Sequence, residues 1–166
     1  RTAPNLDMRF EGFDLAKAPA RDARKPVRVC NDADVQGFGA IRGRGLEMVI
    51  TLGTGMGSGL YIDGRLVPNL ELAHHLYSNG KTYEEFVGKE AFESAGKKRW
   101  RPRVRRVVQH LGPVFNYQSL YIGGGNAKHV NIELPPDVSI TPNIAGLLGG
   151  IALWGDAPSG TSRAAQ

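Results

Sequence analysis

Cysteine is almost absent from this sequence of 166 residues, which contains Cys30 alone. A single thiol excludes an internal disulfide and a zinc site built from several cysteines. No apolar run approaches the roughly 18 residues that would indicate a membrane span. No apolar stretch of a signal peptide follows the first residues, Arg1–Pro4. We therefore expect a cytoplasmic protein without a membrane segment and, because the sequence does not begin with methionine, a fragment of a longer chain.

Positive charge predominates and is unevenly distributed. The formal net charge is +5, and the sequence pI is about 9.6. The excess is concentrated in one basic cluster: Lys97, Lys98, Arg99, Arg101, Arg103, Arg105 and Arg106. Such a cluster can bind a polyanion such as polyphosphate. The alternative is a solvated helix face opposite the apolar residues Val104, Val107 and Val108.

The apolar pattern predicts an α/β domain with a mixed sheet flanked by helices. We expect strands at residues 27–30, 47–52, 60–62, 65–68, 119–122 and 138–140. We expect helices beginning at Asn31, Thr82, Pro102 and Ile144, the first ended by Gly43 and Gly45. The first 26 residues are interpreted as a loop with at most a short helical turn. An Asp63-Gly64 hairpin completes a three-strand antiparallel meander.

Four glycines lie within seven residues between two expected strands: Gly53, Gly55, Gly57 and Gly59. Each glycine costs about 0.5–1 kcal/mol relative to alanine in regular structure, and a hairpin needs only one or two. The surplus indicates that a ligand approaches the backbone closely, where bare amides form an anion site. Thr54 and Ser58 add hydroxyl donors, so phosphate is the expected ligand. A long flexible hairpin is the alternative, since no P-loop or dinucleotide fingerprint is present.

Asp32 lies where the first helix is expected to begin. A carboxylate at this position can simply cap the helix. It can also be the general base that accepts the proton of a sugar hydroxyl during phosphoryl transfer. Asn31 can hydrogen-bond a neighbouring hydroxyl, and Asp34 could equally be the cap, leaving Asp32 free.

Glu71 and His74 are three residues apart, so one helical turn or a tight loop presents both on one side. Together a carboxylate and an imidazole can hold sugar hydroxyls. A solvated surface and a metal site are the alternatives. Because the adjacent His75 points the other way and no cysteine is near, we expect no metal ligands here.

Several segments resemble, in order and spacing, the motifs of the ROK family of sugar kinases and repressors. They are Val29–Asp34, Thr51–Gly64, Leu66–His74, Tyr121–Lys128 and Asn143–Gly150. Within the family the chain most resembles the polyphosphate glucokinase branch, and its C-terminal portion. It departs from the family in three ways: it has no cysteine-rich zinc motif, no Asp-Gly-Gly-Thr-type phosphate loop, and Ala73 where glycine is usual.

The resemblance implies an actin-like, ribonuclease-H-like fold with the active site between two lobes. Residues 1–46 would be a remnant of the first lobe and the interlobe segment with the Asn-Asp motif. Residues 47–155 would be the C-terminal lobe, and residues 156–166 a disordered tail. The implied site residues are Asp32 as catalytic base, Asn31, Glu71 and His74 for the sugar, and Gly53, Thr54, Gly55, Gly57, Gly124 and Gly125 for phosphate or nucleotide.

The function expected from this resemblance is a hexokinase-type phosphotransferase. It would transfer a phosphoryl group from polyphosphate or ATP, with Mg²⁺, to a hexose such as glucose. We expect a homodimer, no zinc and no nucleic-acid partner, and no activity from residues 1–166 alone. The alternative is a non-catalytic sugar-binding or regulatory protein.

Overall fold

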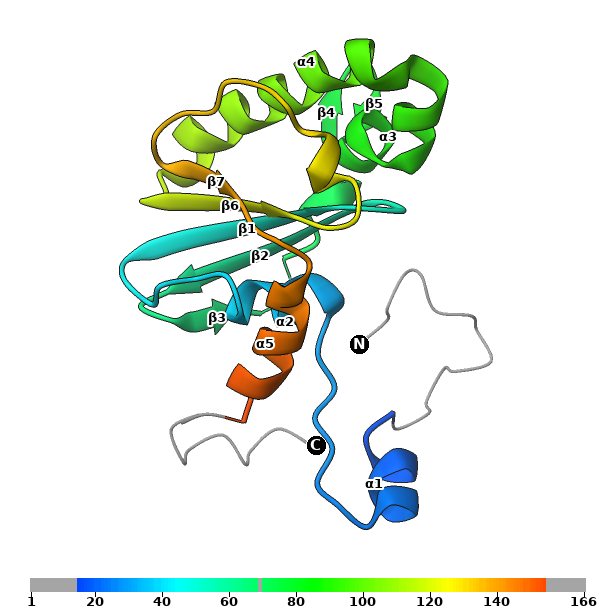
Figure 1. Ribbon diagram of the computed structural model, residues 1–166, viewed down its shortest axis with the longest axis vertical. Helices are drawn as coiled ribbons and strands as arrows, with labels where there is room; N and C mark the ends of the chain where they lie inside the picture. The colour runs from blue at the N-terminus through cyan, green and yellow to red at the C-terminus, as the bar shows by residue number, and fades with distance from the viewer. Residues whose placement is uncertain (1–14, 69, 155–166) are drawn as a thin grey trace. The chain divides into compact units, whose positions relative to one another are not determined.

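The computed structural model describes residues 15–68 and 70–154 and forms two compact units, residues 1–30 and residues 31–166 (Figure 1). In the first unit, α1 (Lys17–Ala23) is a seven-residue helix, longer than the short turn expected. The predicted strand at 27–30 is wrong, because these residues have no regular structure and pair with no strand in the described part of the chain. Val29 is accordingly 56% exposed. The predicted disordered tail lies outside the described residues.

The second unit is built on a five-stranded mixed sheet in the order β3-β2-β1-β6-β7. Its strands are β1 (Leu46–Leu52), β2 (Met56–Ile62), β3 (Arg65–Val67), β6 (Ser119–Gly123) and β7 (Val138–Ile140). The first three form the predicted antiparallel meander, and the Asp63-Gly64 turn has the two positive φ angles of such hairpins, 48° and 77°. β6 is parallel to both β1 and β7. β1 is therefore central, as its continuous apolar sequence indicates.

Helices cover both faces of this sheet (Figure 1). α2 (Asp32–Phe38) and α5 (Ile144–Ala152) lie on one side, and α3 (Tyr83–Val87) and α4 (Lys89–Phe115) lie on the other. α2 stops at Phe38, earlier than predicted. The described residues contain no helix long and apolar enough to cross a membrane.

The larger core lies between the sheet and α4. On β1, Met48, Ile50 and Leu52 face this core, whereas Val49 faces α2. On α4 the predicted apolar stripe is largely confirmed: Val104, Val107, Val108 and Leu111 are buried, but Val114 is 56% exposed. The Nε1 of Trp100 donates to the carbonyl oxygen of Val87 at 2.9 Å, which fixes α4 against α3.

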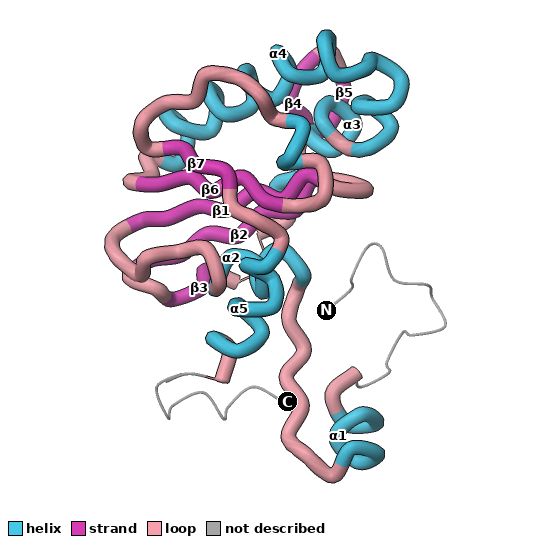
Figure 2. The backbone as a smooth tube through the Cα atoms, in the orientation of Figure 1, coloured by secondary structure: helices cyan, strands magenta, loops and turns pink. Residues whose placement is uncertain are grey.

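The predicted helix beginning at Thr82 is split in two. Thr82 and Glu85 form a capping box at the start of α3, and Gly88 separates α3 from α4. α4 is broken at Gly96 (φ 68°, ψ 162°), and Pro102, expected in a first helical turn, lies within it. A small hairpin of β4 (Leu76–Ser78) and β5 (Lys81–Thr82), which the pattern did not predict, precedes α3 (Figure 2).

Candidate active site

A cleft of about 580 Å³ opens where β1 and β6 end. The two strands are parallel, so their carboxyl ends lie at the same edge of the sheet, where α/β proteins commonly bind ligands. The lining residues are Asp32, Val35, Gln36, Thr51, Gly53, Thr54, Gly124, Gly125, Asn143 and Gly146. The structure thus brings five predicted site residues from three separate segments around one space: Asp32, Gly53, Thr54, Gly124 and Gly125.

Asp32 is held at this cleft by the start of α2. Asn31 is the N-cap, and its side-chain oxygen accepts the amide of Ala33 at 2.8 Å. The same amide lies 2.8 Å from Oδ1 of Asp32, so one carboxylate oxygen is fixed by the backbone. The cap is therefore not Asp34. Asn31, predicted to hold sugar, serves the helix in this structure, while Asp32 is exposed at the cleft.

The glycine-rich segment is mostly strand, not the extended turn that was expected. Gly53 N–H donates to the carbonyl oxygen of Gly55 at 3.0 Å, which closes a short turn, and β2 begins at Met56. A methyl group on Gly57 would overlap the side chains of Thr51 and Ala33. These contacts account for Gly57 by packing within the protein.

Gly55 and Ser58 also make contacts within the protein. A methyl group on Gly55 would overlap the carboxylate of Glu84. Ser58, expected to donate to phosphate, is buried; its Oγ donates to the carbonyl oxygen of Leu70 at 3.1 Å and accepts from the amide of Leu72 at 3.4 Å. It fixes the loop that carries Glu71 rather than reaching the cleft.

Gly53 and Gly125 behave differently from these glycines. Both line the cleft, neither has a positive φ, and a methyl group on either would meet no protein atom within 4 Å. Gly124, by contrast, has φ 87° and packs on the backbone of Leu52, so the fold itself requires glycine there. Packing gives no reason for glycine at positions 53 and 125, which leaves room for a ligand against their backbone.

Asn126 ties the two open glycines together. Its main-chain N–H donates to the carbonyl oxygen of Leu52 at 2.8 Å, and its side-chain Nδ2 donates to the carbonyl oxygen of Gly53 at 3.4 Å. The turn after β1 and the turn after β6 are therefore held side by side at the cleft.

Carboxylates gather beside the first turn of α2. Burial, followed by the negative charges of Glu71 and Asp32, raises the pKa of Asp34 from 3.8 to about 6. Glu71 therefore lies within electrostatic reach of α2, on the side of Asp34. It does not line the cleft, and neither does His74, which is exposed at the end of the short 3₁₀ helix η2 (Leu72–His74).

Three polar residues of the cleft were missed by the sequence analysis: Gln36, Thr51 and Asn143. Gln36 follows Asp32 by four residues and so shares its helix face, a signal present in the sequence. Thr51 lies at the end of β1, and Asn143 precedes α5 inside a segment already noted for its resemblance. Only the fold brings these three side chains to one place.

No protein-family model matches the chain. Among curated proteins, the polyphosphate glucokinase of Mycobacterium leprae (strain TN) is 28% identical over 157 residues, 89% of this chain and 48% of that protein. The crystal structure of an inorganic polyphosphate/ATP-glucomannokinase from Arthrobacter sp. strain KM matches with a TM-score of 0.75 and 31% identity, covering 92% of this chain and 65% of that one. The chain thus spans between about half and two thirds of the length of these relatives.

A ROK family glucokinase from Streptomyces griseus, solved with glucose and AMPPNP, matches with a TM-score of 0.63 over 84% of this chain and 71% of that one. At 17% identity it shows the fold alone. Together these matches define the class: the fold is that of the actin-like ROK sugar kinases, which confirms the predicted fold class. The similar proteins of higher identity are named polyphosphate glucokinase and inorganic polyphosphate/ATP-glucomannokinase, which confirms the resemblance inferred from the motifs.

Proposed function

We propose that the complete protein is a sugar kinase that transfers a phosphoryl group from polyphosphate or ATP to a hexose, with glucose as the first candidate. One observation carries the proposal: Asp32 shares a cleft with Gly53 and Gly125, whose glycine character no protein contact explains. The names of the similar proteins, polyphosphate glucokinase and polyphosphate/ATP-glucomannokinase, support the same reaction.

The roles follow from the positions around the cleft. Asp32 accepts the proton of the sugar hydroxyl as that oxygen attacks the terminal phosphorus of the donor. The bond from this phosphorus to the bridging oxygen breaks, and ADP or the shortened polyphosphate leaves. The backbone at Gly53 and Gly125 faces the transferred phosphate, and Thr54 offers a hydroxyl to it. Glu71 and His74 remain the proposed sugar ligands, on the loop that Ser58 anchors.

Magnesium would enter with the phosphoryl donor. Among the residues the structure describes, no group of three or more His, Cys, Asp or Glu side chains could hold a metal ion. Mg²⁺ usually keeps several waters and binds substrate phosphates together with one or two carboxylates, so the phosphates of the donor would supply its main ligands. Chelation of divalent cations should abolish turnover.

The test is a coupled assay of the complete protein across several hexoses, each with ATP and with polyphosphate. Formation of hexose phosphate with at least one donor is the expected result. Sugar binding without turnover under any condition would contradict the kinase and favour the non-catalytic sugar-binding alternative.

A paired substitution tests the phosphate site directly. Gly53→Ala and Gly125→Ala should leave the free energy of unfolding within about 0.5 kcal/mol and raise KM for the phosphoryl donor several-fold. Gly57→Ala, whose methyl group overlaps Thr51 and Ala33, should instead destabilise the fold. Unchanged donor kinetics in both cleft variants would show that phosphate does not approach these glycines.

A further inference from the structure

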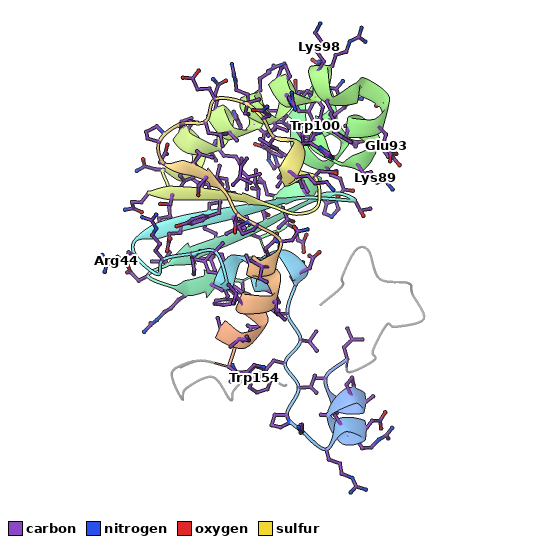
Figure 3. All side chains as sticks on the ribbon, in the orientation of Figure 1. Arg44, Lys89, Glu93, Lys98, Trp100 and Trp154 are labelled. Carbon is purple, nitrogen blue, oxygen red and sulfur yellow. The ribbon has the colours of Figure 1, made fainter. Side chains whose placement is uncertain are left out.

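The basic cluster at residues 97–106 does not form one continuous surface. The guanidinium groups of Arg103 and Arg106 lie 5.5 and 5.8 Å from the ring centroid of Phe86, on one flank of α4. Lys98 points outward, whereas Trp100 points into the core (Figure 3). Across the described part of the chain, the recorded ion pairs, Arg21–Asp22 and Lys89–Glu93, include none of the seven cations. In this part of the chain no carboxylate therefore lies within ion-pair distance of them.

Two of these cations, Lys97 and Arg101, converge with Lys128 on a second segment. The Nε of Arg101 donates to the carbonyl oxygen of His129 at 2.9 Å. Burial lowers the pKa of His129, and so do the nearby charges of Lys97, Lys128 and Arg101. Three cations therefore lie within electrostatic reach of His129, in a group that we call the Lys97–Arg101–Lys128 patch.

The side chain of His129 at this patch is held by an aromatic contact. Phe92 stacks on His129 with ring centroids 5.0 Å apart and planes 12° from parallel. The break at Gly96 lies between Phe92 and Lys97, so the stacked ring and the first cation come from different halves of α4. Lys97 and Lys128 are both exposed and available to a ligand.

The patch and the cleft share one short segment of the chain, residues 125–128. Lys128 follows Gly125 by three residues, so their Cα atoms lie at most about 11 Å apart. Between them, Asn126 holds this segment to Leu52 and Gly53 by the two hydrogen bonds described above. Lys128 is therefore within reach of a ligand that extends about 11 Å beyond Gly125.

We propose that the Lys97–Arg101–Lys128 patch binds the continuing chain of a linear polyphosphate whose terminal phosphate lies in the cleft at Gly53 and Gly125. The proposal rests on the proposed kinase function. A group of cations outside the cleft matches a ligand that carries negative charge along its whole length. ATP carries charge only on three phosphates, after which a neutral ribose and an aromatic base follow. The aromatic base of ATP would need a free ring face on which to stack, but Phe92 already covers one face of the His129 imidazole. The patch therefore suits a polyanion better than a nucleotide.

Direct binding of labelled polyphosphate, measured by fluorescence anisotropy in the complete protein, tests this proposal without relying on activity. The test variant is Lys97→Gln/Lys128→Gln, which leaves the hydrogen bond of Arg101 intact. The matched control, Lys98→Gln/Arg99→Gln, removes the same charge from exposed positions next in the sequence. We expect the test variant to bind long polyphosphate about tenfold more weakly, and the slope of log K against log salt to fall by about 2. The control should change neither by more than about twofold.

Short ligands complete the experiment. Tripolyphosphate and MgATP, measured by competition, should bind the test variant and the parent protein equally, because they do not extend to the patch. Equal losses in test and control variants would overturn the proposal, as would an equal loss for tripolyphosphate. If polyphosphate binding depends on Lys97 and Lys128 but no sugar is phosphorylated, the binding surface stands and the kinase function fails.

Discussion

At the scale of single residues, Asp32 carries the proposed chemistry because the helix start fixes it without burying it. One oxygen accepts the amide of Ala33, and the side chain as a whole remains exposed at the cleft. Asn31 takes the capping role, so Asp32 can both be oriented by α2 and face a substrate.

The substitution Asp32→Asn should remove the proton acceptor while keeping the shape of the side chain. We expect kcat to fall by roughly 10²–10⁴-fold, whereas sugar affinity changes little. Steady-state kinetics together with equilibrium sugar binding measure the two effects separately. A variant that keeps substantial turnover would rule Asp32 out as the base.

Glu47 has a structural role that the sequence analysis did not predict. It lies within an apolar strand, is 1% exposed, and accepts the amides of Arg42, Gly43 and Arg44 and the hydroxyl of Tyr121. Burial alone would raise its pKa, but these hydrogen bonds outweigh it and lower the pKa below the ordinary value of 4.5. The carboxylate thus holds the loop before β1 to the centre of the sheet.

A lowered pKa in the folded state links Glu47 to acid stability. Its contribution is fully present above the unfolded pKa of 4.5 and is lost as pH falls through the lower, folded value. Glu47→Gln should therefore reduce the free energy of unfolding by about 1–3 kcal/mol at neutral pH, and by less in acid. Urea denaturation at several pH values measures this, with the exposed Glu133→Gln as control. A difference that does not shrink as pH falls would contradict the assignment.

At the scale of elements, the packing of α2 against α5 determines where the cleft forms. Gly39 at the end of α2 and Gly149 of α5 lie at the crossing, where a methyl group on either would overlap the backbone of the opposite segment. This close approach brings Asp32, at the start of α2, to the same cleft as Asn143 and Gly146, at the start of α5.

Two neighbouring glycines of α5 offer a matched test of this crossing. A methyl group on Gly149 would overlap the carbonyl oxygen of Val35, whereas one on Gly150 would meet nothing within 4 Å. We expect Gly149→Ala to destabilise the protein by about 1–3 kcal/mol, and Gly150→Ala to be neutral or to stabilise it by about 0.5–1 kcal/mol. Thermal unfolding compares them, and equal midpoints would show that the crossing is looser than described.

At the scale of the whole molecule, the excess of positive charge distinguishes the two candidate donors. A polyanion that displaces counterions along a cationic surface binds with a steep dependence on salt, with a slope near 0.7–0.9 per neutralised phosphate. Added KCl should therefore reduce polyphosphate-driven turnover more steeply than ATP-driven turnover. Parallel salt titrations measure both slopes. Equal slopes would indicate that polyphosphate neutralises no more cations than ATP does, which would contradict its binding along a cationic surface.

Local patterns were sufficient where each residue's neighbours in the sequence are also its neighbours in space. The Asp63-Gly64 hairpin, the strand at β1, the helix start at Asn31-Asp32 and most of the apolar stripe of α4 were predicted on this basis. Local patterns failed for Val27–Cys30, because a β-branched run forms a strand only where another strand is free to pair with it.

The sequence by itself determined the class of fold, the start of α2 at Asp32 and the presence of a glycine-rich segment after β1. Only the tertiary structure decided which glycines are free for a ligand. Gly57 and Gly124 are required by protein contacts, and Gly55 lies against the carboxylate of Glu84, while Gly53 and Gly125 meet no protein atom. The physical reason is that glycine looks the same in the sequence whether a neighbouring side chain, a left-handed backbone or a ligand requires it. That distinction depends on atoms brought close by the pairing of β1 with β2 and β6 and by the packing of α2 and α3.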